Sequence, residues 1–425
     1  MDFTTLKALL KMEVIQRREE GCDVGGFDAE VSALLPGDVE AAEALYEALD
    51  NLEPEPTFAY YEPSSLDAIR AARPAGVRRV PLAWDDDTLQ DRIHGAWLGR
   101  CVGCSVGKPV EGWPRERIEE YLILAKAYPL DDFIPLLDPL PAGFRMHPDH
   151  LQSVKGRIQY MARDDDMDYT ILGLSYLERY GLGFTTEDVA ASWLQRLPYH
   201  LVYTAERETY RNLVNGLRPP RSATYRNPFR EWIGAQIRAD AFGYVAPGWP
   251  EKAAEFAYRD AAVSHVKNGI YGEMWVAAML ASALVSDNLD TVLQAGLAEI
   301  PAKCRLAEAV RATIAARGKH RTWQDAWDAL MVEYGHYDRV HTINNAVIVL
   351  LGLLYGEMDL GKTVCIAVMG GLDTDCNGAT AGSIMGAMLG AKRLPERWTA
   401  PLNDRLLSIV VGYQDNRISD LAQRT

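Results

Sequence analysis

Residues 370–390 read GGLDTDCNGATAGSIMGAMLG, in which glycine recurs at every fourth position, at Gly378, Gly382, Gly386 and Gly390. A glycine inside a helix costs roughly 1 kcal/mol relative to alanine, and residues four apart share one helical face. An earlier stretch, GAWLGRCVGCSVG, has the same spacing at Gly95, Gly99, Gly103 and Gly107. We therefore predict two helices whose backbones approach closely along their glycine faces.

Two aspartates, Asp373 and Asp375, stand where the second of these helices is expected to begin. One aspartate would cap free N–H groups and face the positive end of the helix dipole. The pair exceeds that need, and a second acidic run, residues 164–166 with Asp168, precedes another helical pattern that ends at Gly181. We predict a metal site, with capping as the alternative. Oxygen ligands without a nearby histidine favour magnesium, or else manganese or calcium, over zinc.

Four segments of the chain, in the same order, resemble motifs of the ADP-ribosylglycohydrolase family, whose members resemble dinitrogenase reductase-activating glycohydrolase. The segments are GCSVGKPVEG at 103–112, DDD at 164–166, GAQIRADAFGYVAPG at 234–248 and DTDC at 373–376. The corresponding family motifs are Gly-Asp-Ala-x-Gly-x-Pro-x-Glu, Thr-Asp-Asp, a Gly-Asn-Gly run leading to Met-Arg and Pro-Gly, and Asp-x-Asp-Thr. The resemblance covers about residues 90–395.

The resemblance implies a compact orthogonal helical bundle that hydrolyses a ribosyl glycosidic bond. It implies removal of ADP-ribose from a modified protein or a small molecule, with two Mg²⁺ ions, or Mn²⁺, as cofactor. Carried over by motif, the metal ligands are Asp164, Asp165, Asp166, Asp373, Asp375 and the position of Cys376. The implied catalytic residues are Glu111, Asp165 and Asp375, and Glu111 aligns with a glutamate that gates the site and serves in acid–base roles. Its alternative is an exposed loop carboxylate.

Three departures from the family pattern indicate a divergent branch. Asp164 replaces the usual threonine, Cys376 replaces another threonine, and Cys104 stands where the family often has aspartate. A carboxylate in place of a hydroxyl makes the site more negative. We therefore expect the geometry of the second metal, and the leaving group, to differ from the family standard.

Candidate substrate-binding residues follow from the same resemblance. Gln236 and Arg238 lie in the segment similar to the nucleotide-contacting motif, and His265 and Asn268 lie in AAVSHVKNG, which resembles a helix reaching the substrate cleft. A histidine on an apolar helix is as readily a satisfied core residue. A further polar cluster, His341, Asn344 and Asn345, precedes a very apolar helix. We expect one of the three to cap it and the others to line the pocket.

Some charged and cysteine-containing stretches have simpler interpretations. The pair Cys101 and Cys104 falls among glycines, where small residues are wanted, so we favour packing over a zinc site. The acidic run of residues 84–91, WDDDTLQD, is interpreted as a helix cap. Arginines are concentrated between residues 207 and 230. We expect a solvated face there, with contact to a substrate pyrophosphate as the alternative.

Composition and patterning favour an all-α enzyme. The chain has 425 residues, 48% of them hydrophobic, six cysteines and a formal charge of −15, which argues against binding to nucleic acid. No apolar run approaches the about 18 residues of a membrane span, and the N-terminus lacks a signal-peptide core, so a cytoplasmic location is predicted. Proline-containing loops separate a helical N-terminal extension, residues 1–80, from a catalytic domain, residues 81–425.

Two other functions remain open at this level. The chain could hydrolyse a nucleoside or another small N-riboside, because the best-matching motifs concern metal and ribose. It could also be a non-catalytic, crystallin-like relative. The presence of Glu111, Asp165, Asp166, Asp373 and Asp375 favours an enzyme. The sequence predicts neither the leaving group nor the oligomeric state.

Overall fold

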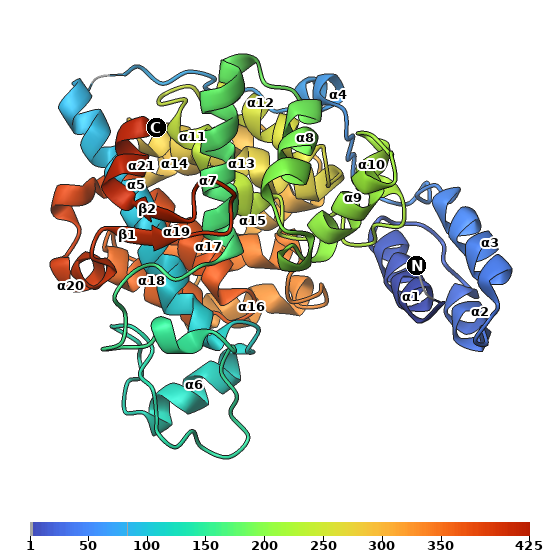
Figure 1. The fold of residues 1–425 in the computed structure, drawn as a ribbon, viewed down its shortest axis with the longest axis horizontal. Coiled ribbons are helices and arrows are strands. Elements are labelled where there is room, and N and C mark those ends of the chain that lie inside the picture. Colours follow the sequence, from blue (N-terminus) through green and yellow to red (C-terminus); the bar gives the residue numbers. More distant parts are fainter. Residues whose placement is uncertain (1–2, 83) are drawn as a thin grey trace.

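The computed structural model describes residues 3–82 and 84–425 and confirms an all-α architecture (Figure 1). Within those residues, 21 α-helices are accompanied by a single antiparallel hairpin of β1 (Arg405–Leu407) and β2 (Asp415–Arg417). Arg405 faces Arg417 in its register. No helix among the described residues combines the length and apolar character that a membrane crossing requires.

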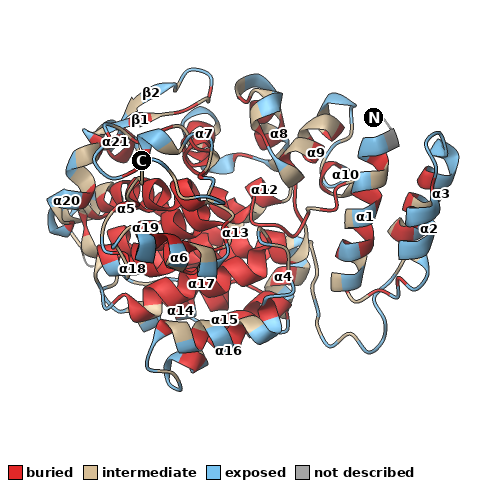
Figure 2. Cartoon of the chain, turned by 90° about the horizontal axis from the view of Figure 1, so that it is seen from below, coloured by how far each residue is buried: buried red, intermediate tan, exposed pale blue. Residues whose placement is uncertain are grey.

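Two long helices form the centre of the body, α5 (Asp86–Gly107) and α19 (Thr374–Leu389). A Cβ atom added to Gly99 would lie 2.1 Å from the carbonyl oxygen of Gly382, and one added to Gly103 would lie 1.9 Å from that of Gly378. No side chain fits at such distances, so the two backbones touch directly. The predicted packing along the glycine faces is confirmed, and both helices lie in the buried core (Figure 2).

The other helices complete the body. On the N-terminal side of the sequence they are α6 (Arg115–Leu124), α7 (Asp165–Tyr180), α8 (Thr186–Arg196), α9 (Thr204–Val214), α10 (Arg221–Thr224), α11 (Asp240–Tyr244) and α12 (Pro250–Ala261). They continue with α13 (Lys267–Ala283), α14 (Leu289–Ala298), α15 (Arg305–Arg317), α16 (Trp323–Tyr334), α17 (Thr342–Tyr355), α18 (Leu360–Met369), α20 (Glu396–Thr399) and α21 (Ile418–Arg424). In α13 every residue from Asn268 to Ala283 is buried.

Local signals set the ends of the helices that lead to the site. Asp85 caps α5 by accepting a hydrogen bond from the Thr88 N–H at 2.8 Å, as the acidic run predicted. Gly181 follows α7 with a φ of 65°, a left-handed conformation that glycine adopts without strain. The predicted start and stop are both confirmed.

The N-terminal helices form a small unit with its own apolar cluster at one side of the molecule (Figure 1). They are α1 (Phe3–Glu19), α2 (Phe27–Ala33) and α3 (Val39–Asp50), and the cluster includes Leu10, Val14 and Leu49. A mostly irregular segment, containing only α4 (Leu66–Ala72) as a helix among its described residues, leads from them to α5. The boundary near residue 80 stays a prediction.

Buried ion pairs join this extension to the body. We call Glu13, Glu20, Glu62, Arg230, Glu231 and Arg305 the junction network. Arg230 contacts Glu13 at 2.9 Å and Glu20 at 3.0 Å, and Arg305 contacts Glu62 and Glu231, each at 2.8 Å.

Other arginines of the 207–230 concentration also contact the extension. Arg221 pairs with Asp50 at 3.2 Å, and Arg226 pairs with Glu43 at 2.8 Å. Arg221, Arg226 and Arg230 therefore dock the extension, whereas Arg211 pairs with Glu208 within the body. Neither a purely solvated face nor contact with a substrate accounts for these pairs.

Candidate active site

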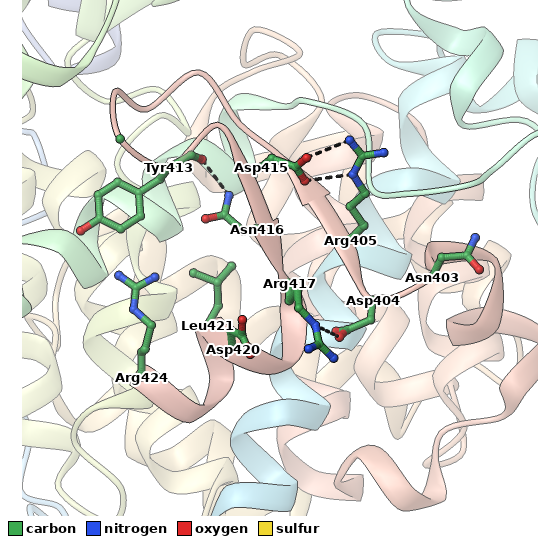
Figure 3. Close-up of a pocket in the computed structure, with 11 residues that line it drawn as sticks. Asn403, Asp404, Arg405, Tyr413, Asp415, Asn416, Arg417, Asp420, Leu421 and Arg424 are labelled. Carbon is green, nitrogen blue, oxygen red and sulfur yellow. Dashed lines mark hydrogen bonds and ion pairs between the residues drawn. The ribbon is translucent and has the colours of Figure 1, made fainter.

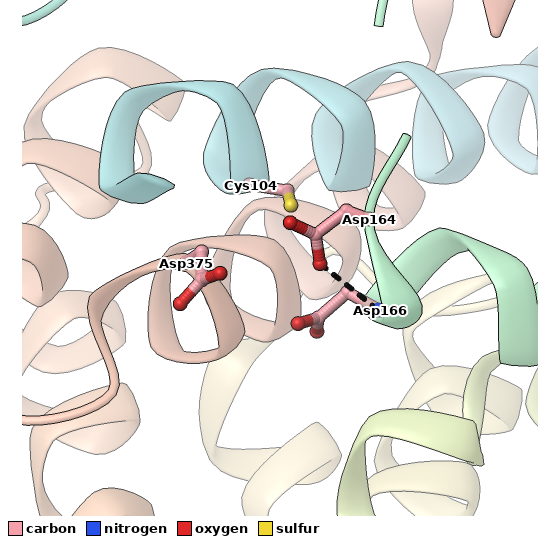
Figure 4. Close-up of side chains that lie close together, drawn as sticks. All are labelled: Cys104, Asp164, Asp166 and Asp375. Atoms are coloured by element: carbon pink, nitrogen blue, oxygen red, sulfur yellow. Dashed lines mark hydrogen bonds between the residues drawn. The ribbon is translucent and has the colours of Figure 1, made fainter. Parts of the chain in front are cut away.

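Three chain segments bring acidic side chains together at one end of the glycine-faced helix pair. They are the C-terminal part of α5, the start of α7 and the start of α19 (Figure 4). Ligand atoms of Cys104, Asp164, Asp166 and Asp375 all lie within 4.8 Å of one another, and we call them the first acidic group. Asp373, Asp375 and Cys376 meet the same criterion and form the second acidic group. All of these residues are buried.

A cavity of about 550 Å³ opens beside the two groups. Its size falls in the range of small-molecule sites. Predicted site residues in its wall are Glu111, Asp165, Asp166, Asp373, Asp375 and Cys376. Among the other residues in the wall are Lys108, His147, Arg163, Tyr169, Tyr203, Glu206, Trp232 and Arg339.

Asp164 is neutralised by a lysine that follows α5. Lys108 begins the short 3₁₀ helix η1 (Lys108–Val110), is only 4% exposed and forms an ion pair with Asp164. Burial, the largest single influence, raises the pKa of Asp164, but Lys108, Arg163 and the Asp166 N–H together lower it below its usual value. The other oxygen of Asp164 accepts the Asp166 N–H at 3.0 Å and so caps α7.

Asp166 is held from behind by a fully buried arginine of α5. Arg100 contacts Asp166 at 3.1 Å and Asp240 at 2.8 Å. The thiol of Cys376 donates to the second carboxylate oxygen of Asp166, with a distance of 3.1 Å between the heavy atoms. Burial raises the pKa of this thiol, which favours the protonated form that donates this hydrogen bond.

Asp373 and Asp375 form no ion pair among the described residues, although the charge of Lys108 acts on Asp375 from nearby. Burial, and then the charge of Asp375, raise the pKa of Asp373 well above its usual range. Burial, and then the charge of Glu111, raise the pKa of Asp375 in the same way. Asp373 makes no side-chain cap to α19, and Asp375 Oδ1 is buried without a hydrogen-bond partner among the described residues. Capping therefore does not explain the pair. Oxygen donors that lack a partner fit a hard divalent cation.

Asp165, the remaining predicted metal and catalytic residue, projects from the first turn of α7 into the cavity wall. Burial, and then the neighbouring charge of Asp164, raise the pKa of Asp165. It belongs to neither acidic group. Its place suits contact with a substrate in the cavity.

Glu111 lies at the cavity in a turn that is fixed to the Asp373 loop. The Gly112 N–H donates to the carbonyl oxygen of Leu372 at 2.9 Å, and the Leu372 N–H donates to that of Trp113 at 3.1 Å. These bonds link the turn to the Asp373 loop, and the role of Glu111 as a gate stays a prediction. Glu111 approaches His147 Nε2 at 3.5 Å. Burial, and then the charge of Asp373, raise the pKa of Glu111 to about 8.

A family model described as ADP-ribosylglycohydrolase matches residues 85–425, which is most of the chain. The chain belongs to the ADP-ribosylglycohydrolase family. A solved structure entitled "ADP-ribosylglycohydrolase-related protein complex" is similar at 19% identity, covering 80% of this chain and 98% of that chain, with a TM-score of 0.46. No curated protein matches the sequence.

Two of the four substrate-binding residues that the resemblance to ADP-ribosylglycohydrolases implied, Gln236 and Arg238, do not line the cavity. Both are fully buried. Arg238 pairs with Asp260, and with Glu206 at 2.6 Å, so it supports the cavity from behind its wall. Gln236 packs against the α13 backbone near Gly272. A cationic side chain buried this deeply pairs with carboxylates before any ligand arrives.

His265 and Asn268 likewise have contacts within the body and do not line the cavity. Ser264 Oγ lies 2.7 Å from His265 Nδ1, and burial lowers the pKa of His265 well below its usual range. The Asn268 amide donates to Glu231 at 2.9 Å and to Glu62 at 2.8 Å. These two residues therefore hold the α13 start and the junction network in place.

In the polar cluster, His341 caps α17 as expected, but Asn344 and Asn345 lie within its first turn and do not line the cavity. His341 Nδ1 accepts the Ile343 N–H at 3.2 Å and caps the helix. Asn345 Oδ1 accepts the Asp373 N–H at 3.2 Å, and Asn344 donates to the Asp338 carbonyl at 2.9 Å. Asn345 thus supports the Asp373 loop from outside the cavity.

Sequence reasoning missed Arg100 and Lys108, the two cations that touch the first acidic group. Both stand in an otherwise small and apolar glycine-spaced stretch, where a buried charge requires a partner. A charged residue in such a stretch was the sequence signal from which these two cations could have been identified. Arg163, Tyr203, Trp232 and Arg339, which complete the wall, carry no comparable local signal.

A second hollow, of about 870 Å³, lies at the C-terminal hairpin (Figure 3). Its charged side chains pair with each other. Arg405 contacts Asp415 at 2.9 Å, and Arg417 contacts Asp404 at 3.0 Å. Because its charges are balanced and exposed, this hollow is a weaker candidate for chemistry than the acidic cavity.

Proposed function

We propose that the chain is a magnesium-dependent glycosidase that hydrolyses the bond between ADP-ribose and a modified protein or small molecule. The observation that carries the proposal is the unneutralised second acidic group at the wall of a cavity of about 550 Å³. Family membership supports glycohydrolase chemistry on ADP-ribose compounds. The oxygen-rich donor set supports magnesium over zinc.

The residues of the second acidic group, Asp373 and Asp375, would hold the cation. When bound, it supplies Lewis acidity toward a water molecule or ribose hydroxyls. Around it, Asp165 offers a carboxylate that stabilises positive charge developing on the sugar as the glycosidic bond breaks. Arg339, also in the wall, is placed to attract a phosphate.

Glu111 would serve as the group that exchanges a proton with the leaving group or the attacking water. Burial, the largest cause, raises its pKa to about 8, and a raised pKa favours the protonated carboxyl that a general acid requires. The neighbouring His147 can accept or return that proton. Because the turn is fixed to the Asp373 loop, the proton stays at a constant position relative to the cation ligands.

The proposal is tested by incubating the protein and Mg²⁺ with ADP-ribosylated proteins, ADP-ribosylated amino acids and nucleosides, with products identified by mass spectrometry. Asp373→Ala and Asp165→Ala should reduce turnover by at least about 1,000-fold. Asp373→Ala should also lose the rise in melting temperature that Mg²⁺ causes.

Asp415→Ala, which removes an exposed aspartate paired with Arg405, is the matched control and should retain both properties. An unchanged Mg²⁺ shift in Asp373→Ala would refute the cation ligands. Cleavage of nucleosides alone would favour the N-riboside alternative, and no cleavage of any substrate would favour a non-catalytic relative.

A further inference from the structure

A protein cation already occupies the first acidic group. The Lys108 ammonium pairs with Asp164, and the side chain is almost completely buried. It enters from the 3₁₀ turn after α5, between the helices that carry Cys104 and Asp375. An ammonium is a compact point charge with three donors, so it satisfies carboxylates much as a small cation does.

The carboxylate oxygens of the first acidic group that come from α7 are all occupied. Asp164 accepts from Lys108 with one oxygen and from the Asp166 N–H with the other. Asp166 accepts from Arg100 with one oxygen and from the Cys376 thiol with the other. A metal ion in this group would have to share these oxygens with their donors and lie beside the positive charge of Lys108.

The second acidic group presents the opposite situation. Asp375 Oδ1 has no hydrogen-bond partner among the described residues, and Asp373 makes no cap to its helix. The two groups share Asp375, so they are adjacent. A lysine ammonium pairs with a carboxylate of the first group, whereas neither aspartate of the second group forms an ion pair among the described residues.

We propose that Lys108 takes the place of one of the two divalent cations that the family resemblance implies, so that this chain binds a single ion, at the second acidic group. The inference rests on the metal dependence proposed above. One departure from the family pattern and one residue at a position that the pattern leaves open act together here. Asp164 provides a carboxylate where the family has a threonine hydroxyl, and Lys108, at an unspecified position of the first motif, neutralises it.

The competing interpretation is that Lys108 only compensates the additional charge of Asp164 and leaves both ion positions available. The two interpretations differ in the number of ions bound per chain. Mn²⁺ is a suitable probe because it substitutes for Mg²⁺ at oxygen sites and its paramagnetic resonance signal reports free and bound ion. Two bound ions close together also broaden each other's signal.

The experiment titrates Mn²⁺ into the wild type and into Lys108→Met, which keeps the length of the side chain and removes its charge. We expect one ion per wild-type chain and two per Lys108→Met chain, with dipolar broadening only in the variant. Lys155→Met is the matched control, because Lys155 also pairs with an aspartate, Asp132 at 2.9 Å, but at the surface. It should bind one ion.

Lys108→Met leaves Asp164 buried without its cation and could fail to fold. A second variant therefore removes both charges. Lys108→Met/Asp164→Thr removes both charges and retains an N-cap residue for α7. It should also bind two ions, and thermal melting verifies that each variant is folded. Equal numbers of ions in the wild type and both variants would overturn the role of Lys108.

The outcomes also separate this inference from the proposed function. Two ions in the wild type would overturn the substitution by Lys108 and leave the hydrolase proposal intact. No bound ion in the wild type or the variants would overturn both the inference and the metal dependence of the proposed reaction.

Discussion

The acidic cavity and the junction network bury carboxylates to a similar degree but differ in the cations they provide. In the junction network, burial disfavours the charge of Glu20, yet Arg230 and Lys267 outweigh burial and lower its pKa to about 2. At the cavity, Asp373 and Asp375 have raised pKa values because burial and neighbouring carboxylates act in the same direction. Buried charge alone therefore does not identify the site. An excess of buried negative charge over positive charge identifies it.

Removing a cation from the balanced region is expected to have the largest effect on stability. Arg305→Met leaves Glu62 and Glu231 buried without their shared partner, which should lower the free energy of unfolding by about 3–5 kcal/mol. Urea denaturation measures the loss. Arg417→Met removes an arginine from an exposed pair with Asp404 and should cost less than about 1 kcal/mol. Equal losses in the two variants would remove the distinction between the two environments.

The next largest effect should be kinetic and confined to the cavity. Glu111→Gln should lower turnover by roughly 100-fold, about 2.7 kcal/mol in the barrier, because the carboxyl that exchanges a proton is lost. The Mg²⁺-dependent rise in melting temperature should persist. Glu178→Gln, which alters a surface glutamate paired with Arg424, should leave turnover unchanged. Wild-type turnover in Glu111→Gln would exclude Glu111 from the reaction.

A smaller effect, opposite in sign to that of Arg305→Met, is expected when a surplus charge is removed. With divalent ions chelated, Asp375→Asn should raise the free energy of unfolding, on the order of 1 kcal/mol, by relieving desolvation and repulsion. Since the wild-type pKa is raised on folding, wild-type stability falls as pH rises above the unfolded value, so the gain should be greater at pH 8 than at pH 5.

The same variant in saturating Mg²⁺ should instead be less stable than the wild type, because it loses a ligand. Asp415→Asn provides the control at the surface, where Arg405 already neutralises the carboxylate. A destabilising effect of Asp375→Asn in chelator, equal to that in Mg²⁺, would contradict the assignment of surplus charge to this aspartate.

The sequence predicted the features that depend on local spacing. The glycine-faced helices follow from a repeat of four, and the helix starts at Asp164 and Asp373 follow from acidic runs before apolar patterns. These signals are contained in segments of about 20 residues or fewer, where helical periodicity determines which side chains share a face.

Features that depend on distant partners were not predicted. Lys108 reaches Asp164 across 56 residues of sequence, and Asn268 reaches Glu62 across 206. Arg238 stood in a plausible motif, yet the fold surrounds it with carboxylates of the body. Whether a polar side chain meets a ligand or another side chain is decided by the tertiary packing, which no local pattern records.

Direct backbone contact between α5 and α19 leaves no intervening side chains at Gly99, Gly103, Gly378 and Gly382 that could repack when neighbouring residues change. Substitutions at Cys104 or Lys108 would thus alter the chemistry of the site while the spacing between its two halves stays fixed. For protein engineering, this pair of helices is a rigid scaffold, on which single substitutions can vary ion preference and reactivity.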